Sequence, residues 1–338
     1  MKSDLVEMLE CPVCHHQLDW QVETEIGDQI EQAEAHCSGC GATYPVIDGI
    51  GVFLTPDLPR KDLWAQVESQ LSLHLKSHPE QEKELMEGPA QDLSPTDQQF
   101  RAMLLDERGE YGEARRVEAL AHENLYTTEY KNGWESQIAY TVDSLSALDG
   151  PIVDLASGRC YLLERITSEL GRPVVATDFS PNVLRRDQAC FQFLKLDHLV
   201  TFLAFDARRT PFKNGAIKIM TTNLGLVNIE GPGDLVDELK RIVSGTLLAI
   251  SHFLPITDDQ NGAVIKEAGI EAFMYKESTR QHFASAGWSL KMENACTARA
   301  LPTPVSAIFE GARADGLPVA PTELEWCTVR AESNKEQP

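Results

Sequence analysis

The stretch Ile152-Val153-Asp154-Leu155-Ala156-Ser157-Gly158-Arg159-Cys160 decides the fold of this chain. Its apolar first half predicts a buried strand at residues 151–155, and apolar positions at helical spacing follow in residues 162–170. Gly171 is placed to end that helix. A tight turn between a strand and a helix points backbone N–H groups at the space in front of the turn. The stretch therefore predicts a ligand site at the end of this strand.

The same order of strand, loop and helix is repeated towards the C-terminus. Ser180 is a typical N-cap residue and Pro181 fits the first turn of a helix, so a helix is predicted there. Apolar runs predict strands at residues 174–177, 200–205, 217–222, 246–252, 289–296 and 325–331, and a helix at residues 235–243. This alternation is typical of the α/β class, in which helices cover both faces of a parallel sheet.

Acidic residues stand at the ends of the first three strands, at Asp154, Asp178 and Asp206. An acid after the second strand can accept hydrogen bonds from both hydroxyls of a ribose. Together with the turn at residues 156–160, the ordered set resembles the class I S-adenosylmethionine-dependent methyltransferases over residues 121–332. The resemblance implies a Rossmann-like sheet, S-adenosylmethionine as cofactor, and an adenine amino group near Asp206. It implies cofactor contacts from Asp154, Ala156, Gly158, Asp178, Asp206 and Ala207.

The turn departs from the pattern of that family, which has glycine at three alternating positions. Only Gly158 remains, and Ala156 and Cys160 occupy the other two positions. Both side chains are small, so a ligand can still approach the backbone closely. Three alternatives stay open: acids that only cap helices or turns, a scaffold that has lost its ligand, and a dehydrogenase of the same fold. A dehydrogenase would favour a Gly-x-Gly-x-x-Gly loop, which the run from Ala156 does not supply.

Two Cys-x-x-Cys pairs lie near the N-terminus, Cys11 with Cys14 and Cys37 with Cys40. Each pair can direct two sulfurs at one point, and four thiolates form the tetrahedral ligand set that zinc prefers. Four sulfurs leave no position for water, so the predicted zinc is structural rather than catalytic. The neighbouring histidines His15, His16 and His36 are expected to be bystanders, and the alternative is that one of them replaces a sulfur.

The residues around these pairs add a second resemblance. Cys-Pro-x-Cys, Cys-x-x-Cys-Gly and the run Tyr44-Pro45-Val46-Ile47-Asp48-Gly49-Ile50 resemble the small zinc ribbons that activate tRNA and translation-factor methyltransferases. The resemblance covers residues 5–54, in which a strand, a turn and a second strand are expected after the second pair. It implies that the ribbon packs on its own methyltransferase domain, as an activator subunit supplied in cis.

Methyl transfer demands no universal catalytic residue, because the methyl group is already activated and the enzyme mainly positions the acceptor and excludes water. The catalytic candidates are Asn223, Asn228 and His252, which follow the fourth and fifth strands at the edge of the sheet where ligands bind. The two asparagines could orient a polar acceptor, and His252 could remove a proton. The alternative is that all three only satisfy loop backbone or close a strand end.

Length and composition allow one large core and a smaller module, since the 338 residues are 42% hydrophobic. The predicted units are a zinc ribbon at 1–54, a helical linker at 55–120 and the methyltransferase domain at 121–338; residues 63–75 of the linker have helical spacing. No apolar run is long enough to span a membrane, and the first 20 residues lack the features of a secretory signal. The expected location is therefore the cytoplasm, with no membrane partner.

The net charge of −22, from 52 acidic against 30 basic residues, disfavours nucleic acid as the methyl acceptor. A small molecule or a protein is the expected acceptor, although its identity is unknown. An rRNA or tRNA methyltransferase is the alternative, because some rRNA guanine methyltransferases also carry an N-terminal zinc ribbon. A local basic group could steer an anionic substrate: Arg185, Arg186, Arg208, Arg209 and Lys213.

Overall fold

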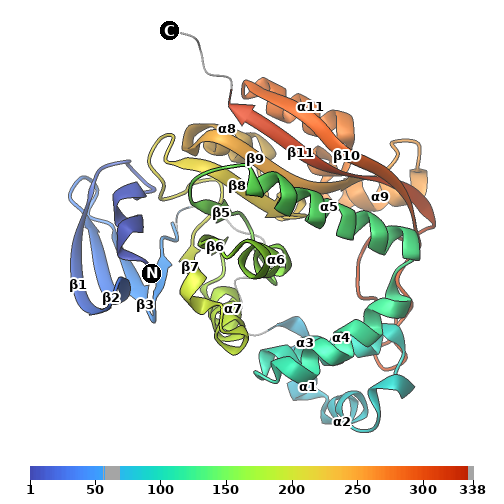
Figure 1. Ribbon diagram of the computed structural model, residues 1–338. Helices are drawn as coiled ribbons and strands as arrows, with labels where there is room; N and C mark the ends of the chain where they lie inside the picture. The colour runs from blue at the N-terminus through green and yellow to red at the C-terminus, as the bar shows by residue number, and fades with distance from the viewer. Residues whose placement is uncertain (56, 58–68, 334–338) are drawn as a thin grey trace.

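The computed structural model describes residues 1–55, 57 and 69–333, and within them the strands form one continuous sheet (Figure 1). The sheet has eleven strands in the order β1-β2-β3-β4-β7-β6-β5-β8-β9-β11-β10. Pairing is parallel from β4 through to β9, which confirms the α/β class with a parallel centre. The strands are β1 Leu18–Ile26, β2 Gln29–Cys37, β3 Thr43–Ile47, β4 Ile50–Val52, β5 Ile152–Asp154, β6 Val174–Asp178, β7 Val200–Ala204, β8 Ile217–Asn223, β9 Val243–Phe253, β10 Trp288–Ala300 and β11 Thr322–Ser333.

Helices cover both faces of this sheet, as the sequence predicts. In β9, Leu248 and Ile250 face a core shared with α5, α6 and α7, whereas Leu247 and Ala249 face a core shared with α8, α10 and α11. This period-two alternation is what a strand buried on both faces requires. The helices are α5 Thr128–Ser146, α6 Tyr161–Leu170, α7 Pro181–Leu194, α8 Pro232–Ile242, α9 Asp259–Ala268, α10 Glu271–Met274 and α11 Lys276–Ser285.

The predicted helix ends agree with the structure. Gly171 ends α6 with a left-handed backbone, at a φ of 61°. Ser180 caps α7, where its side chain accepts a hydrogen bond from the backbone N–H of Val183 at 3.3 Å. In the ribbon, β3 and β4 form the expected strand, turn and strand. The long hairpin of β1 and β2 was not predicted, because most side chains of β1 are exposed and give no apolar alternation.

The ribbon joins the rest of the sheet through β4. Ile50, Gly51 and Val52 pair in parallel with residues 202–204 of β7. A Cβ atom on Gly51 would lie 2.7 Å from Leu203 Cδ2 and 3.0 Å from the ring of Phe53, so a larger residue there would force these side chains to shift. The expectation that the ribbon packs on its own methyltransferase domain is therefore confirmed.

A group of helices lies apart from the sheet in Figure 1. The first of them overlaps the helix predicted at residues 63–75, of which residues 63–68 are outside the described residues. The group consists of α1 Gln70–Ser77, α2 Pro79–Met86, α3 Pro95–Glu107 and α4 Tyr111–Leu125. The loop between β10 and β11 holds α3 in place. The buried Asp97 accepts hydrogen bonds from Ser306 Oγ and, at 2.9 Å, from the backbone N–H of Ala307. Thr96 donates to the carbonyl of Pro304 at 2.5 Å.

Among the described residues, no helix combines the length and the apolar character that crossing a membrane requires.

Close packing of α5 on β11 generates a stability prediction. A Cβ atom on Gly133 would lie 2.4 Å from Cδ1 of Trp326, a fully buried ring. We expect Gly133→Ala to lower the free energy of unfolding by roughly 1–3 kcal/mol, since overpacking a core forces neighbours to shift. Gly112→Ala on α4 is the matched control, because its nearest contact would be an ordinary 3.8 Å. Urea unfolding measures both; equal stability of Gly133→Ala and the wild type would contradict this account of the packing.

Candidate active site

The turn between β5 and α6 has the backbone shape that a glycine-rich turn would adopt. Ala156, Gly158 and Cys160 have φ values of 51°, 55° and 57°, so all three adopt the left-handed conformation. Ala156 and Cys160 thus occupy conformations that favour glycine, at a cost of about 1–2 kcal/mol each. The two replacements keep the shape of the turn at the expense of stability.

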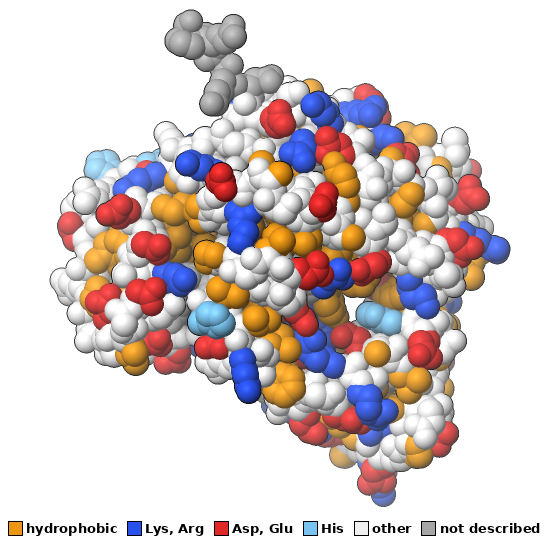
Figure 2. Space-filling model, in the orientation of Figure 1, with side chains coloured by type: hydrophobic (Ala, Val, Ile, Leu, Met, Phe, Trp, Pro, Cys, Tyr) orange, Lys and Arg blue, Asp and Glu red, His pale blue; other side chains and the backbone are white. Residues whose placement is uncertain are grey.

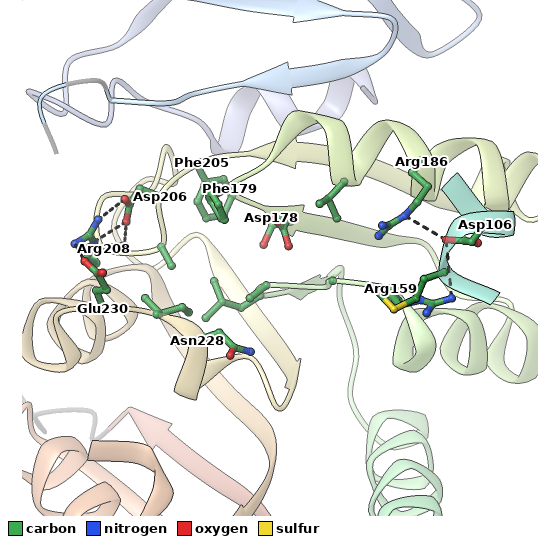
Figure 3. Close-up of a pocket in the computed structure, with 18 of the residues that line it drawn as sticks. Asp106, Arg159, Asp178, Phe179, Arg186, Phe205, Asp206, Arg208, Asn228 and Glu230 are labelled. Atoms are coloured by element: carbon green, nitrogen blue, oxygen red, sulfur yellow. Dashed lines mark hydrogen bonds and ion pairs between the residues drawn. The ribbon is translucent and has the colours of Figure 1, made fainter. Parts of the chain in front are cut away.

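A pocket of about 1100 Å³, part of it open to solvent, lies in front of this turn. It collects the carboxyl ends of β5, β6 and β7 and the segment after β8. Figure 3 shows Asp178 in the middle, Asp206, Arg208 and Glu230 at one end, and Asp106 with two arginines at the other. Of the six residues expected to bind the cofactor, five line the pocket: Ala156, Gly158, Asp178, Asp206 and Ala207.

Asp178 and Asp206 are both held by groups that favour a charged carboxylate. Burial raises the pKa of Asp178, and backbone N–H groups oppose this, among them that of Ser180 at 3.0 Å from Oδ1. Asp206 accepts two hydrogen bonds from the guanidinium of Arg208, at 2.9 and 2.7 Å, and one from the Arg208 backbone at 3.0 Å. Both carboxylates are therefore fixed in orientation before a ligand binds.

Asp154 does not line the pocket. Its side chain is 1% exposed, and Oδ1 accepts a hydrogen bond from Thr221 Oγ1 at 2.5 Å. Burial raises the pKa of its carboxyl to about 7. Its backbone carbonyl accepts from Thr177 Oγ1 at 2.7 Å and from Ser157 Oγ at 3.1 Å. In this structure Asp154 ties together β6, β8 and the turn.

The structure separates the three catalytic candidates. Asn228 lines the pocket opposite Asp178 (Figure 3). Asn223 accepts a hydrogen bond from Trp134 Nε1 at 3.2 Å, outside the lining. His252 lines a separate small cavity and packs edge-on against Trp326, with ring centroids 4.9 Å apart. Burial lowers the pKa of His252 to about 4, and its Nδ1 atom is buried without a hydrogen-bond partner among the described residues.

Other lining residues were not predicted to contact the cofactor. Met103, Asp106 and Glu107 reach the pocket from α3, which sequence reasoning assigned to a linker. Arg159 directly follows Gly158, and Arg186 comes from α7. Arg186 had a signal, as did Arg208 at the other end of the pocket, because both belong to the basic group predicted to steer an anion. No local pattern shows that residue 106 lies beside residues 159 and 186.

The four N-terminal cysteines form the candidate metal centre. Their sulfur atoms all lie within 4.8 Å of one another, with Cys11 and Cys40 at 3.6 Å and Cys14 and Cys37 at 3.3 Å. Four sulfurs at about 2.3 Å from a tetrahedral zinc lie near this spacing, so the donor set fits the ion. The histidines next to the two Cys-x-x-Cys pairs are not part of this cluster of ligand atoms.

All three neighbouring histidines have identified partners, and that of His16 is the backbone carbonyl of Cys14, at 3.1 Å. His15 contacts Glu10 at 2.8 Å, and His36 contacts Thr43 at 3.2 Å. The third, His16, lies so close to Gly39 that a Cβ atom there would be 2.6 Å from its ring. The glycine in the second Cys-x-x-Cys pair thus makes room for a histidine that is not a ligand.

Comparisons with known proteins agree with both parts of the chain. Residues 2–49 match the family model of Trm112p-like proteins, and residues 153–247 match the model of a methyltransferase domain. No curated protein matches the sequence significantly. Among solved structures, a protein of Bacillus halodurans C-125 described as a methyltransferase is 16% identical, with a TM-score of 0.46 over 59% of this chain and 99% of that one.

Geranyl diphosphate C-methyltransferase from Streptomyces coelicolor A3(2) is 15% identical, with a TM-score of 0.44 over 59% of this chain and 79% of that one. Scores below 0.5 carry no inference about function, so the conclusion follows from the two family models and the cysteine cluster. The chain contains a methyltransferase domain and, ahead of it, a Trm112p-like zinc ribbon whose four cysteines lie together.

Proposed function

We propose that the pocket in front of the β5–α6 turn holds S-adenosylmethionine and that the methyl acceptor is a small molecule. The single observation that carries the proposal is the convergence of Asp178, Asp206 and the turn on one pocket. The adenine ring lies at the end of the pocket lined by Asp206 and Ala207. The Asp178 carboxylate accepts hydrogen bonds from the ribose hydroxyls. The methionine part follows the backbone of residues 156–158.

The residues of the chain position reactants rather than form covalent bonds. When bound, S-adenosylmethionine would supply a methyl group that is activated by the positive charge on its sulfur. The fixed carboxylates of Asp178 and Asp206 orient the nucleoside, and the apolar lining from Phe179, Phe205 and Ile229 excludes water. Orientation of this kind is the main requirement for transfer of an activated methyl group.

Asn228 is the strongest candidate for contact with the acceptor, because it lines the pocket. Its amide nitrogen donates to the Leu224 carbonyl at 3.2 Å, so the side chain is held in one orientation. Asn223 and His252 stay candidates at the same edge of the sheet. With a pKa near 4, His252 is neutral at pH 7 and could accept a proton only if its cavity opens to the acceptor.

Two features favour a small molecule over a macromolecule. First, α3 contributes Met103, Asp106 and Glu107 to the lining, so this helix closes one end of the pocket (Figure 3). Second, Figure 2 shows acidic and basic side chains interspersed over one face, without a continuous basic stripe for a phosphate backbone. A protein acceptor would have to insert a side chain past α3.

In this proposal the ribbon is a structural unit of the chain. The chain is divided into the ribbon at 1–54, the helical linker at 55–120 and the methyltransferase domain at 121–338. Zinc orders the ribbon, and the ribbon pairs with β7, whose carboxyl end leads to Asp206. The two Cys-x-x-Cys pairs are assigned to a metal rather than to disulfides, which fits a reducing compartment such as the cytoplasm.

Protein purified without added metal should contain about one zinc per chain. Cys40→Ser should lower the zinc content and the melting temperature; Cys40 is exposed, so metal loss rather than packing causes the change. Cys296→Ser, outside the cluster, should change neither quantity. Metal analysis and thermal unfolding measure the three proteins. A folded wild type free of metal would refute the zinc site.

Asp178→Asn should weaken S-adenosylmethionine binding by more than tenfold while the fold stays intact. The reason is that hydrogen bonds to a charged acceptor contribute about 1.5–3 kcal/mol each. Asp143→Asn, on the exposed side of α5, is the matched control and should bind like the wild type. Isothermal calorimetry measures the affinities. Equal affinity for Asp178→Asn and the wild type would limit Asp178 to its hydrogen bond with the backbone N–H of Ser180.

Bulk rRNA and tRNA should bind weakly, and binding should vanish by about 0.2 M salt, because the net charge of −22 leaves few bases for phosphate contacts. Filter binding across a salt series measures this. Submicromolar, sequence-selective RNA binding at physiological salt would favour an RNA acceptor instead.

A further inference from the structure

Two arginines define the end of the pocket opposite Asp206. Arg159 and Arg186, here called the arginine pair, come from the β5–α6 turn and from α7. Both approach the same carboxylate, that of Asp106, which α3 extends across this end (Figure 3). A second, smaller cavity begins behind Asp106 and Arg159, so these two residues stand between two spaces.

The contacts between Asp106 and the arginine pair are long. The Oδ2 atom of Asp106 lies 3.9 Å from Arg159 and 3.4 Å from Arg186, and among the described residues no hydrogen bond joins them. By contrast, Arg115 donates two hydrogen bonds to Glu164, at 2.8 and 2.6 Å. The Nε atom of Arg186 is buried and has no hydrogen-bond partner in the described part of the chain. The pair therefore has unused capacity for a carboxylate with better geometry.

While Asp106 contacts the arginine pair, the net charge of the pair and its acidic partners disfavours binding of a further anion. Arg159 also contacts Glu118 at 3.1 Å, and Arg186 contacts Asp187 at 3.2 Å. Two cations thus already face three acids, and an additional carboxylate would be repelled. If Asp106 leaves, each arginine still keeps one acidic partner.

The position of Asp106 in its helix agrees with a replaceable contact. Asp106 is the last residue but one of α3, where an acid interacts unfavourably with the helix dipole. The other end of α3 is fixed to the β10–β11 loop through Thr96 and Asp97. Release of Asp106 would remove the contact of α3 with the arginine pair, while the end of the helix stays held by the buried Leu104 and Leu105 and by the hydrogen bond from Ser72 to Glu107.

We propose that the arginine pair is a carboxylate-binding site and that Asp106 is an internal placeholder, which a carboxylate of the bound ligand displaces. The displacement moves the Asp106 side chain away from the arginine pair. The inference rests on the proposed placement of the cofactor in the same pocket. The carboxylate has two possible sources, the methionine part of the cofactor or a carboxylate on the acceptor.

Calorimetry with matched ligands tests the proposal. The first arm compares S-adenosylmethionine with its decarboxylated form, and the second titrates benzoate into the protein with and without S-adenosylhomocysteine. Asp106→Asn keeps the shape of the side chain and removes the competing charge. Arg186→Gln removes half of the pair. Arg116→Gln, in an exposed pair with Glu113, is the control and should behave like the wild type.

Asp106→Asn should strengthen binding of the carboxylate-bearing ligand by about tenfold, and Arg186→Gln should weaken it by at least as much, since one charge-assisted contact is gained or lost. Effects on S-adenosylmethionine but not on its decarboxylated form assign the site to the cofactor. Effects on benzoate alone assign it to the acceptor. Thermal unfolding of each variant confirms that it is folded.

Unchanged affinities for all ligands in Asp106→Asn would overturn the placeholder, because this variant keeps the size of the side chain and removes only its charge. If the wild type binds neither adenosine ligand, the proposed cofactor site fails, and the benzoate arm without S-adenosylhomocysteine still decides on the arginine pair.

Discussion

Parallel pairing of β5, β6 and β7 is the constraint on which the rest of the structure depends. In-register pairing of Asp154 with Ala176, and of Asp178 with Ala204, brings the carboxyl ends of these strands to one edge of the sheet. Residues that are far apart in the sequence, such as Asp178 and Asp206, therefore line one pocket. Within the turn, Ala156 and Cys160 accept a strained backbone so that the same space stays open.

The ribbon extends this constraint across the whole chain. β4 forms the outer neighbour of β7, and the shared core runs from Phe53 of the ribbon to Leu203 of β7. An edge strand of the methyltransferase sheet is thus covered by the same polypeptide rather than by a separate subunit. Zinc holds the ribbon in shape at one side, and α3 closes the pocket at another. Both lie outside residues 153–247, which match the methyltransferase domain.

The central strands, the ends of α6 and α7 and the cysteine cluster could be predicted because their signals are local. These signals are the apolar periodicity, the helix-capping residues and the spacing of the Cys-x-x-Cys pairs. Whether the side chain of an acid at a strand end points into the core or into the pocket could not be predicted from the sequence. Asp154 and Asp178 both follow apolar strands, yet Thr221 draws the first into the core and the second faces the pocket. The closure of one pocket end by α3 was not predictable either, since the contacts of this helix depend on the β10–β11 loop, which lies about 200 residues further along the chain.

The central claim is that the strand-end acids hold the nucleoside of S-adenosylmethionine. A crystal structure of the protein with S-adenosylhomocysteine tests this most directly. The account predicts ribose hydroxyls within hydrogen-bond distance of the Asp178 carboxylate, and adenine beside Asp206 and Ala207. A nucleoside bound outside this pocket, or one whose ribose makes no contact with Asp178, would contradict it.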